Sequence, residues 1–276
     1  MSDAKVRNPF VYSAAARRYA RGRPNFHAQV VRRVQRVLRV NKAEVDLVVD
    51  VGCGTGASSI AFASVARRVL AIDPSIAMLA CARKNARVTY ARAQAERIPA
   101  KKASADLVVA GVAFHWFDQS RFLKEAMRVL KPGGWLVVYS DYCTFKTSGS
   151  KLLRQWAEDQ YYKTFPAPPH HHYRVEPSLA RRFCFSNASV QRFTYSIDFR
   201  LNEFVEYLTT HSNVIVAVGS NDPRLRAVRH FLSSDLRSLF GKRKRRVKFE
   251  CTLQVFRRRA QNARCQADFC KRDCRR

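Results

Sequence analysis

A chain of 276 residues, 47% of them hydrophobic, can bury a full core, and its length suits one α/β domain with an insertion better than two equal domains. It has no run of about 18 apolar residues and no charged-then-apolar leader, so we expect a cytoplasmic protein without a membrane segment. The 51 Lys and Arg residues against 21 acidic residues give a net charge of +30, which would attract polyanions such as nucleic acid.

The first predicted element is a helix at residues 27–40, where apolar side chains recur at helical spacing. Strands and helices then alternate up to residue 145. The strands are predicted at 46–51, 69–72, 87–92, 106–112 and 135–140, and the helices at 57–66, 75–86 and 119–130. Gly133 and Gly134 are expected to end the last of these helices. This alternation predicts a doubly wound, mostly parallel α/β sheet.

Beyond residue 145 the alternation stops. The sequence then predicts, in order, a helical stretch at 150–165, a loop at 166–173, a strand at 189–199, helices at 201–218 and 222–240, and a strand at 247–256. We therefore expect one domain over residues 1–256, made of a core at 27–145 and a C-terminal part at 146–256 that covers a substrate. Residues 257–276 form a basic, cysteine-containing tail that we expect to be disordered.

The most informative segment is 45–56, where a buried strand runs into a turn with three glycines, Gly52, Gly54 and Gly56. Glycine allows a positive φ and lets a ligand approach main-chain N–H groups where a Cβ would collide. The next strand ends at Asp73. Ligands of open α/β sheets lie beyond the carboxyl ends of the strands, so Asp73 could accept both hydroxyl protons of a ribose. The alternative is that Asp73 caps the following helix, with Pro74 at its first position.

Six motifs, in a fixed order along the chain, together resemble those of a known family. They are D-V-G-C-G-T-G at 50–56, A-I-D-P-S at 71–75, A-Q-A-E-R-I-P at 93–99, A-D-L-V-V at 105–109, F-H-W-F-D at 114–118 and V-L-K-P-G-G at 129–134. Together they resemble the class I S-adenosylmethionine-dependent methyltransferases of the type 11 branch. The run Y-A-R-G-R-P-N-F at 19–26 is similar to the start of the trans-aconitate and biotin-pathway enzymes, which mostly modify small acids and metabolites.

The resemblance implies a Rossmann-like fold of seven strands with an antiparallel last strand, a helical insertion near the C-terminus, and S-adenosylmethionine as cofactor. It also implies that the backbone at Gly52, Gly54 and Gly56 approaches the methionyl and ribose portions and that Asp73 takes the ribose hydroxyls. Asp50 would orient the methionyl amino group, or serve only a structural role at the strand end.

The adenine position departs from the family, because Ala93 and Gln94 precede the Ala95-Glu96 pair where most members have Asp-Ala or Gly-Asp. The Gln94 amide oxygen can accept from the adenine amino group and the Ala95 N–H can donate to the ring. We therefore expect binding that is weakened and not abolished.

The acceptor side is predicted after the fourth strand, at Phe114, His115 and Trp116. His115 could take the acceptor proton, because its ordinary pKa lies near neutral pH. We favour the alternative in which His115 and Trp116 pack against the adenosine and shape the pocket, since a carboxylate acceptor is already ionised and needs no base.

Tyr12, Tyr19 and Arg23 are expected to close this pocket from the N-terminal segment. Arg23 would suit a carboxylate through bidentate pairing, or it could form a surface salt bridge.

No metal site is predicted. Neighbouring side chains in the run at 170–172 point apart, and Cys265, Cys270 and Cys274 miss zinc spacing. The eight cysteines contain no C-x-x-C pair and are expected to be reduced. The basic clusters at 242–246 and 257–276 predict non-specific attraction to nucleic acid.

The sequence thus favours transfer of a methyl group from S-adenosylmethionine to a small molecule, with a carboxylate oxygen as one candidate acceptor. One alternative is an RNA methyltransferase of the same fold, which the net charge suggests. The other is a non-catalytic binding or scaffold protein that keeps the fold, which the Gln94 departure suggests.

Overall fold

The computed structural model describes residues 9–39, 45–147 and 150–259. Within these ranges seven strands form one sheet in the order β3-β2-β1-β4-β5-β7-β6. The strands are β1 (Val45–Val51), β2 (Ala66–Asp73), β3 (Val88–Arg92), β4 (Ala105–Gly111), β5 (Leu130–Thr147), β6 (Phe185–Phe199) and β7 (Arg245–Arg258). β1 to β5 pair in parallel, and β7 runs antiparallel to both β5 and β6. The predicted Rossmann-like sheet is confirmed.

Helices lie on both faces of this sheet. They are α1 (Ser13–Gly22), α2 (His27–Leu38), α3 (Ala57–Phe62), α4 (Ile76–Ala80), α5 (Gln119–Val129), α6 (Leu152–Trp156), α7 (Tyr162–Thr164), α8 (Pro177–Arg182), α9 (Leu201–Leu208), α10 (Ser212–Val218) and α11 (Asp222–Phe240), with a 3-10 turn η1 (Phe114–Trp116) and a π-helical turn η2 (Ala157–Tyr161). No helix in the described ranges is long and apolar enough to span a bilayer.

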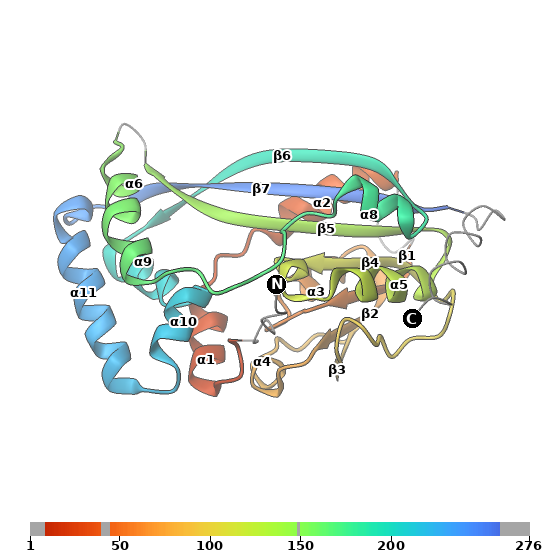
Figure 1. The fold of residues 1–276 in the computed structure, drawn as a ribbon, viewed down its shortest axis with the longest axis horizontal. Helices are drawn as coiled ribbons and strands as arrows, with labels where there is room; N and C mark the ends of the chain where they lie inside the picture. Colours follow the sequence, from red (N-terminus) through yellow and green to blue (C-terminus); the bar gives the residue numbers. More distant parts are fainter. Residues whose placement is uncertain (1–8, 40–44, 148–149, 260–276) are drawn as a thin grey trace, which may run out of the picture.

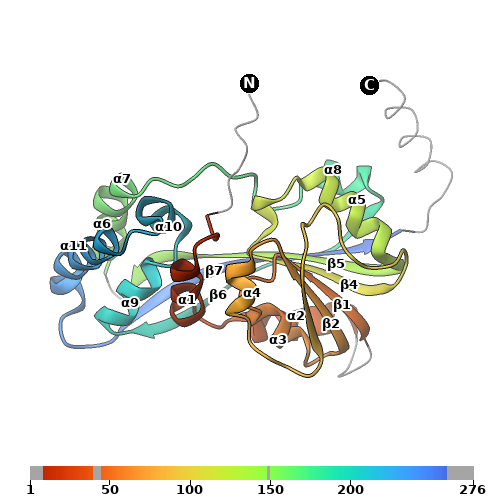
Figure 2. The ribbon, with the colours of Figure 1, turned by 90° about the horizontal axis from the view of Figure 1, so that it is seen from below.

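Strand side chains alternate between two apolar layers, as the period of a strand requires. Val48 of β1 packs in the layer that contains Val30 of α2 and Phe62 of α3. Val49, the next residue, packs in the opposite layer with Phe122 of α5. Figure 2 shows α2 and α3 on one side of the sheet and α5 and α8 on the other. Burial on both faces explains why β1 and β4 are almost continuously apolar.

The C-terminal part extends this core and does not form a separate one. β5, β6 and β7 are longer than the other strands, and α6, α9, α10 and α11 gather over their far end (Figure 1). The buried side chains of Phe204, Leu232 and Phe249 belong to the same apolar cluster as Val48 and Val137 of the parallel sheet. The two parts are therefore joined by one continuous hydrophobic layer.

Several predicted boundaries are wrong. The predicted helix at 75–86 ends at Ala80, because the backbone of Arg83 leaves the helix and donates its N–H to the Thr55 carbonyl at 3.2 Å. The helix at 57–66 ends at Phe62, and β2 already begins at Ala66.

The predicted helix at 201–218 is two helices. The hydroxyls of Thr209 and Thr210 donate to the carbonyls of Glu206 and Tyr207 at 2.7 and 2.6 Å, and α9 ends at Leu208. Such local bonds compete with helix propagation. Gly133 and Gly134 do not end α5 either. The helix ends at Val129, Leu130 is extended, and Gly133 with φ +75° lies inside the start of β5.

Candidate active site

The three glycines after β1 all have a positive φ, but they do so for different reasons. A Cβ on Gly52 would lie 2.6 Å from the Cβ of Ala113, and a Cβ on Gly56 would collide with the Tyr90 hydroxyl. At Gly54 a Cβ would meet only the Met78 methyl, at 3.1 Å, and both residues line a cavity. Gly52 and Gly56 are thus required by packing, whereas Gly54 leaves room for close approach from the cavity.

The N–H groups of this turn are already used inside the protein. Gly52 donates to the Ile72 carbonyl at 2.8 Å, Gly56 to the Cys53 carbonyl at 2.9 Å, and Gly54 to Asp73 at 2.9 Å. These N–H groups therefore already have acceptors within the protein, and approach of the cofactor to this backbone stays a prediction. What the turn offers is a backbone surface without side chains.

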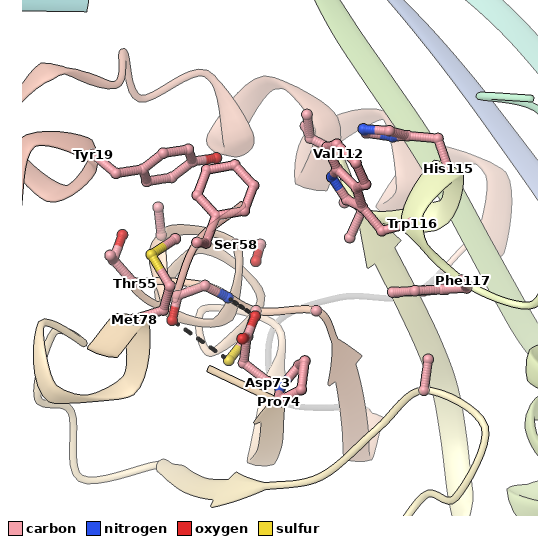
Figure 3. A pocket seen from close by; sticks show the side chains of 18 of the residues that line it. Tyr19, Thr55, Ser58, Asp73, Pro74, Met78, Val112, His115, Trp116 and Phe117 are labelled. Carbon is pink, nitrogen blue, oxygen red and sulfur yellow. Dashed lines mark hydrogen bonds between the residues drawn. The ribbon is translucent and has the colours of Figure 1, made fainter. Parts of the chain in front are cut away.

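Asp73 fastens the turn to the end of β2. One carboxylate oxygen accepts the Gly54 N–H and the other accepts the Ser75 N–H at 2.8 Å. Burial raises the pKa of Asp73, while these backbone hydrogen bonds oppose the shift. The helix-cap alternative is wrong, because Ser75 caps α4 by accepting the Met78 N–H at 3.2 Å. Figure 3 shows Asp73 at the floor of the cavity, where each oxygen keeps a lone pair for a further donor.

Asp50 is fully buried and binds the first turn of α3. One of its oxygens accepts the hydroxyls of Ser58 and Ser59, both at 2.6 Å, and the other is buried without a partner among the described residues. Burial raises the pKa of Asp50 to about 6, although the two serine hydrogen bonds oppose the shift. Asp50 does not line the cavity, so its contact with a methionyl amino group stays a prediction.

A cavity of about 1020 Å³ opens at the carboxyl ends of β1, β2 and β4, which is where ligands lie in doubly wound folds. It brings together nine of the residues predicted from the sequence: Tyr19, Arg23, Gly52, Gly54, Asp73, Gln94, Ala95, His115 and Trp116. Four predicted residues do not line it: Tyr12, Asp50, Gly56 and Phe114.

Two of these four have a clear physical reason to lie elsewhere. Phe114 is 1% exposed and packs in the apolar layer against Phe117 and Phe122, with ring centroids 6.4 and 5.8 Å away. Tyr12, just ahead of α1, is 38% exposed. Phe117, three positions further on, lines the cavity instead (Figure 3).

His115 lies in an aromatic environment. Its ring is 4.7 Å from that of Trp116 and 4.3 Å from that of Tyr173, centroid to centroid. Burial, with smaller contributions from the neighbouring His170 and Arg23, lowers the pKa of His115 to about 3. The imidazole is therefore neutral near pH 7. Its backbone carbonyl accepts the His171 N–H at 2.9 Å, which holds the loop 166–173 over the cavity.

That loop is anchored on both sides of the cavity. The Gln119 amide donates to the His172 carbonyl at 2.7 Å. The Gln254 side chain on β7 accepts the Val175 N–H at 2.9 Å and donates to the Val175 carbonyl at 3.0 Å. His171 lines the cavity as well. The sequence predicts the loop but contains no local signal for where it lies.

The cavity is also lined by Arg23, Asp141, Tyr19 and Ser212. Asp141 follows the predicted fifth strand, and one of its oxygens accepts the Tyr195 hydroxyl at 2.7 Å. Sequence reasoning missed Asp141, although an acid at the end of an apolar strand is the same signal that identified Asp73. Arg23 forms no salt bridge with a described residue, so the surface-pair alternative is wrong.

Among the described residues no group of three or more His, Cys, Asp or Glu side chains is arranged to hold a metal ion. Cys265, Cys270 and Cys274 lie outside the described ranges, as does the tail from residue 260. β7 itself runs to Arg258, two residues past the predicted boundary of the tail.

Comparisons with known proteins agree with this geometry. A family described as a methyltransferase domain matches residues 49–138. A protein of Dictyostelium discoideum named as a methyltransferase is 25% identical over 182 residues, 64% of this chain and 69% of its own. Malonyl-[acyl-carrier protein] O-methyltransferase of a Marinomonas species is 35% identical over 123 residues, 41% of this chain and 44% of its own.

The fold has a counterpart among solved structures. A structure assigned as a type II methyltransferase, from Anaeromyxobacter dehalogenans, superposes with a TM-score of 0.66 and 25% identity over 87% of this chain and 99% of its own. The chain spans about half the length of several of the curated relatives it matches.

The methyltransferase-domain match at residues 49–138, the sheet order, the glycine turn with Asp73 beneath it and these relatives together support a class I S-adenosylmethionine-dependent methyltransferase. It is an enzyme of that class, and S-adenosylmethionine is its cofactor. The residues fit this group, because Asp73 keeps free acceptor sites at the cavity floor and Gly54 has no Cβ to block the approach.

Proposed function

We propose that the protein transfers the methyl group of S-adenosylmethionine to a carboxylate oxygen of a small-molecule acceptor. The observation that carries the proposal is the continuity of one cavity from Asp73 and Gly54 to Arg23. One cavity of about 1020 Å³ can therefore hold a cofactor and a small acid together. The name of the Marinomonas relative, an O-methyltransferase of a malonyl group, supports the same chemistry.

In this proposal Asp73 accepts the ribose hydroxyls and the side-chain-free surface at Gly54 lies against the cofactor. Gln94 and Ala95 hold the adenine edge, and Phe117 covers an adenine face from within the same cavity. Backbone N–H groups play a smaller part than in our sequence-based expectation, because those of the three glycines already have acceptors.

The chemistry is an in-line displacement, which depends on positioning and on exclusion of water. When bound, the cofactor supplies an electrophilic methyl carbon, and the electron pair of the broken C–S bond stays on sulfur. The protein then has to hold an acceptor oxygen in line with that carbon. Trp116 and the loop 166–173 exclude water from the site, and Arg23 attracts an acid into it.

His115 does not serve as the base in this proposal. A general base is most effective when its pKa lies near the working pH, and the pKa of His115 is lowered to about 3 by burial. If the acceptor were a hydroxyl or a protonated amine, His115 would have to accept its proton. An imidazole with so low a pKa is a weak base for that step. A carboxylate is already ionised at neutral pH and avoids the problem.

A methyl-transfer assay tests the proposal. The protein is incubated with methyl-labelled S-adenosylmethionine and a low-molecular-mass metabolite extract. We expect labelled products that release volatile methanol in mild alkali, as methyl esters do. Label that stays in base-stable ether or amine products would contradict a carboxylate acceptor. It would still support methyl transfer by this protein.

Variants at the cavity wall separate packing from base catalysis. We expect His115→Gln to retain most turnover with a flat pH profile near neutrality, whereas loss of a general base costs about 10²–10⁴-fold. Trp116→Ala should be more damaging, because it opens the site to water. The opposite order, with turnover following a titration near pH 6.5, would make His115 the base and the acceptor a hydroxyl or amine.

We also propose that the protein is cytoplasmic and that it attracts nucleic acid without sequence preference. Lys242, Arg243 and Lys244 are exposed in the turn between α11 and β7. Arg246 is paired with Asp198 at 2.8 Å, so it contributes less free charge than its neighbours. This attraction is a property of the surface and is separate from the cavity.

A further inference from the structure

We propose that Arg23 and Asp141 form a two-point subsite for a small acid that also carries a hydrogen-bond donor, such as a hydroxy acid. The subsite names the substrate class of the same cavity, so the identity of this acid as the methyl acceptor rests on the proposed function. Binding of the acid itself does not depend on methyl transfer.

The first point is the guanidinium of Arg23. It lies between two aromatic rings, 5.0 Å from the centroid of Tyr19 and 5.5 Å from that of Tyr207. Its Nε is enclosed and has no hydrogen-bond partner among the described residues. The backbone N–H of Arg23 closes α1 by donating to the Tyr19 carbonyl at 3.2 Å, which fixes where the side chain starts. The cationic group is thus held in position at the cavity wall, with no carboxylate of the described residues in direct contact with it.

An arginine in such a position favours binding of an oxyanion. Stacking on aromatic faces offsets part of the cost of removing the cation from water, but it satisfies none of the five N–H donors. A carboxylate matches the planar fork of the guanidinium and accepts two parallel hydrogen bonds. The ligand that completes this part of the cavity therefore carries a carboxylate.

The second point is Asp141 in β5, two residues past Tyr139, where the parallel pairing of β5 with β4 ends. The Tyr195 hydroxyl donates to one of its oxygens at 2.7 Å and fixes the orientation of the carboxylate. Burial raises the pKa of Asp141, while the charge of Arg23, the Tyr195 hydroxyl and a backbone N–H oppose the shift. Asp141 lines the same cavity as Arg23. No salt bridge within 4.0 Å joins the two charges, so neither neutralises the other by direct contact.

The pair therefore selects by charge and by hydrogen-bond donors. Arg23 attracts a carboxylate, and Asp141 repels a second carboxylate that would occupy its place. A hydroxyl beside the carboxylate can instead donate to Asp141. A monoacid with a neighbouring hydroxyl satisfies both points, and a simple monoacid satisfies one. A neutral amide can donate to Asp141 but lacks the negative charge that Arg23 attracts.

Small fragments test this without knowledge of the natural acceptor. Acetate, glycolate and acetamide are titrated to about 50 mM at constant ionic strength, because ligands of so few atoms bind weakly. Each titration is followed by the change in tyrosine and tryptophan fluorescence and run with and without S-adenosylhomocysteine. We expect saturable binding of both acids, with glycolate about tenfold tighter than acetate, and no binding of acetamide.

Three variants assign the two points. Arg23→Gln should abolish binding of both acids. Asp141→Asn keeps an acceptor for Tyr195 and should keep acetate binding while removing most of the advantage of glycolate. Arg18→Gln is the matched control, because Arg18 lies on the same helix, is 8% exposed and does not line the cavity. It should leave both affinities unchanged, and circular dichroism of all three checks folding.

Two results would overturn the proposal. The first is binding of neither acid to the parent protein, or binding that is equal in the parent and in folded Arg23→Gln. The second is an unchanged glycolate-to-acetate ratio in Asp141→Asn. Failure of S-adenosylhomocysteine to bind would count against the proposed function instead, and the titrations without it still decide the subsite.

Discussion

Asp73 combines two tasks that a single carboxylate can perform at once. It ties the glycine turn to β2 through the N–H groups of Gly54 and Ser75, and it faces the cavity with its remaining lone pairs. The first task fixes the orientation that the second requires. A structural role and a ligand-binding role are therefore not alternatives at this residue.

A pair of variants separates the two tasks. Asp73→Asn should weaken S-adenosylhomocysteine binding by about 1–3 kcal/mol, because one charged acceptor is lost, as measured by calorimetric titration. Asp106→Asn is the control. Asp106 also accepts two backbone N–H groups, those of Asp46 and Leu47 at 3.0 and 2.9 Å, but it does not line the cavity. Equal affinity in Asp73→Asn and the parent would remove Asp73 from the site.

At the residue scale the sequence predicts best those residues whose role follows from the residues next to them in the sequence. Gly54 and Asp73 follow apolar strands, and parallel strands end at the same edge, so their meeting could be predicted. Asp141 carries a similar signal. Its significance depends on Tyr195, which is 54 positions away on β6, and on Arg23, which precedes the sheet altogether. Only packing brings those three together.

The glycine turn is the element on which the cavity depends, and its glycines differ in what surrounds them. We expect Gly52→Ala to lower stability strongly, because its Cβ would press on the Ala113 Cβ in a conformation that alanine already resists. Gly54→Ala should cost only about 1–2 kcal/mol of stability and should instead lower affinity for S-adenosylhomocysteine. Thermal unfolding and titration of both variants measure the two effects. Similar losses of stability, with affinity unchanged in folded Gly54→Ala, would contradict this division.

Elements with strong periodicity were predicted well and their ends were not. The helix predicted at 222–240 is observed with those bounds, because Asn221 caps it by accepting the Arg224 N–H and Gly241 follows it. The stretch at 201–218 has the same apolar periodicity, but Thr209 and Thr210 break it through their own backbone bonds. The early end of α4 depends on Thr55, which is remote in sequence from Arg83. Long-range partners of that kind leave no local signal.

The molecule as a whole contains histidines that folding keeps neutral. Burial lowers the pKa of His27 to about 4 and of His115 to about 3, and it lowers the pKa of His211 well below its usual value. In the unfolded chain these imidazoles bind protons near pH 6.5, whereas in the folded chain they stay neutral to lower pH. The free energy of unfolding therefore falls as the pH drops from 6.5 toward 4. Asp50, with its pKa raised to about 6, acts in the opposite direction between its usual pKa and about 6.

Urea unfolding as a function of pH measures this balance. We expect stability to decrease from pH 7 to pH 5, since three buried histidines act in that direction and the raised pKa values of Asp50, Asp73 and Asp141 oppose them only in part. His27→Gln should reduce the slope by about 1.4 kcal/mol per pH unit, because one proton fewer is taken up on unfolding. A slope identical to that of the parent would show that His27 is protonated in the folded protein.

The central claim is that the cavity beside the glycine turn is a functional S-adenosylmethionine site despite the unusual Gln94. The most direct measurement is calorimetric titration of the whole chain with S-adenosylhomocysteine at neutral pH. Our account predicts one site per chain with micromolar affinity, about −8 kcal/mol. Absence of binding at about 1 mM, in protein shown to be folded, would contradict the account and leave a fold that has lost its cofactor.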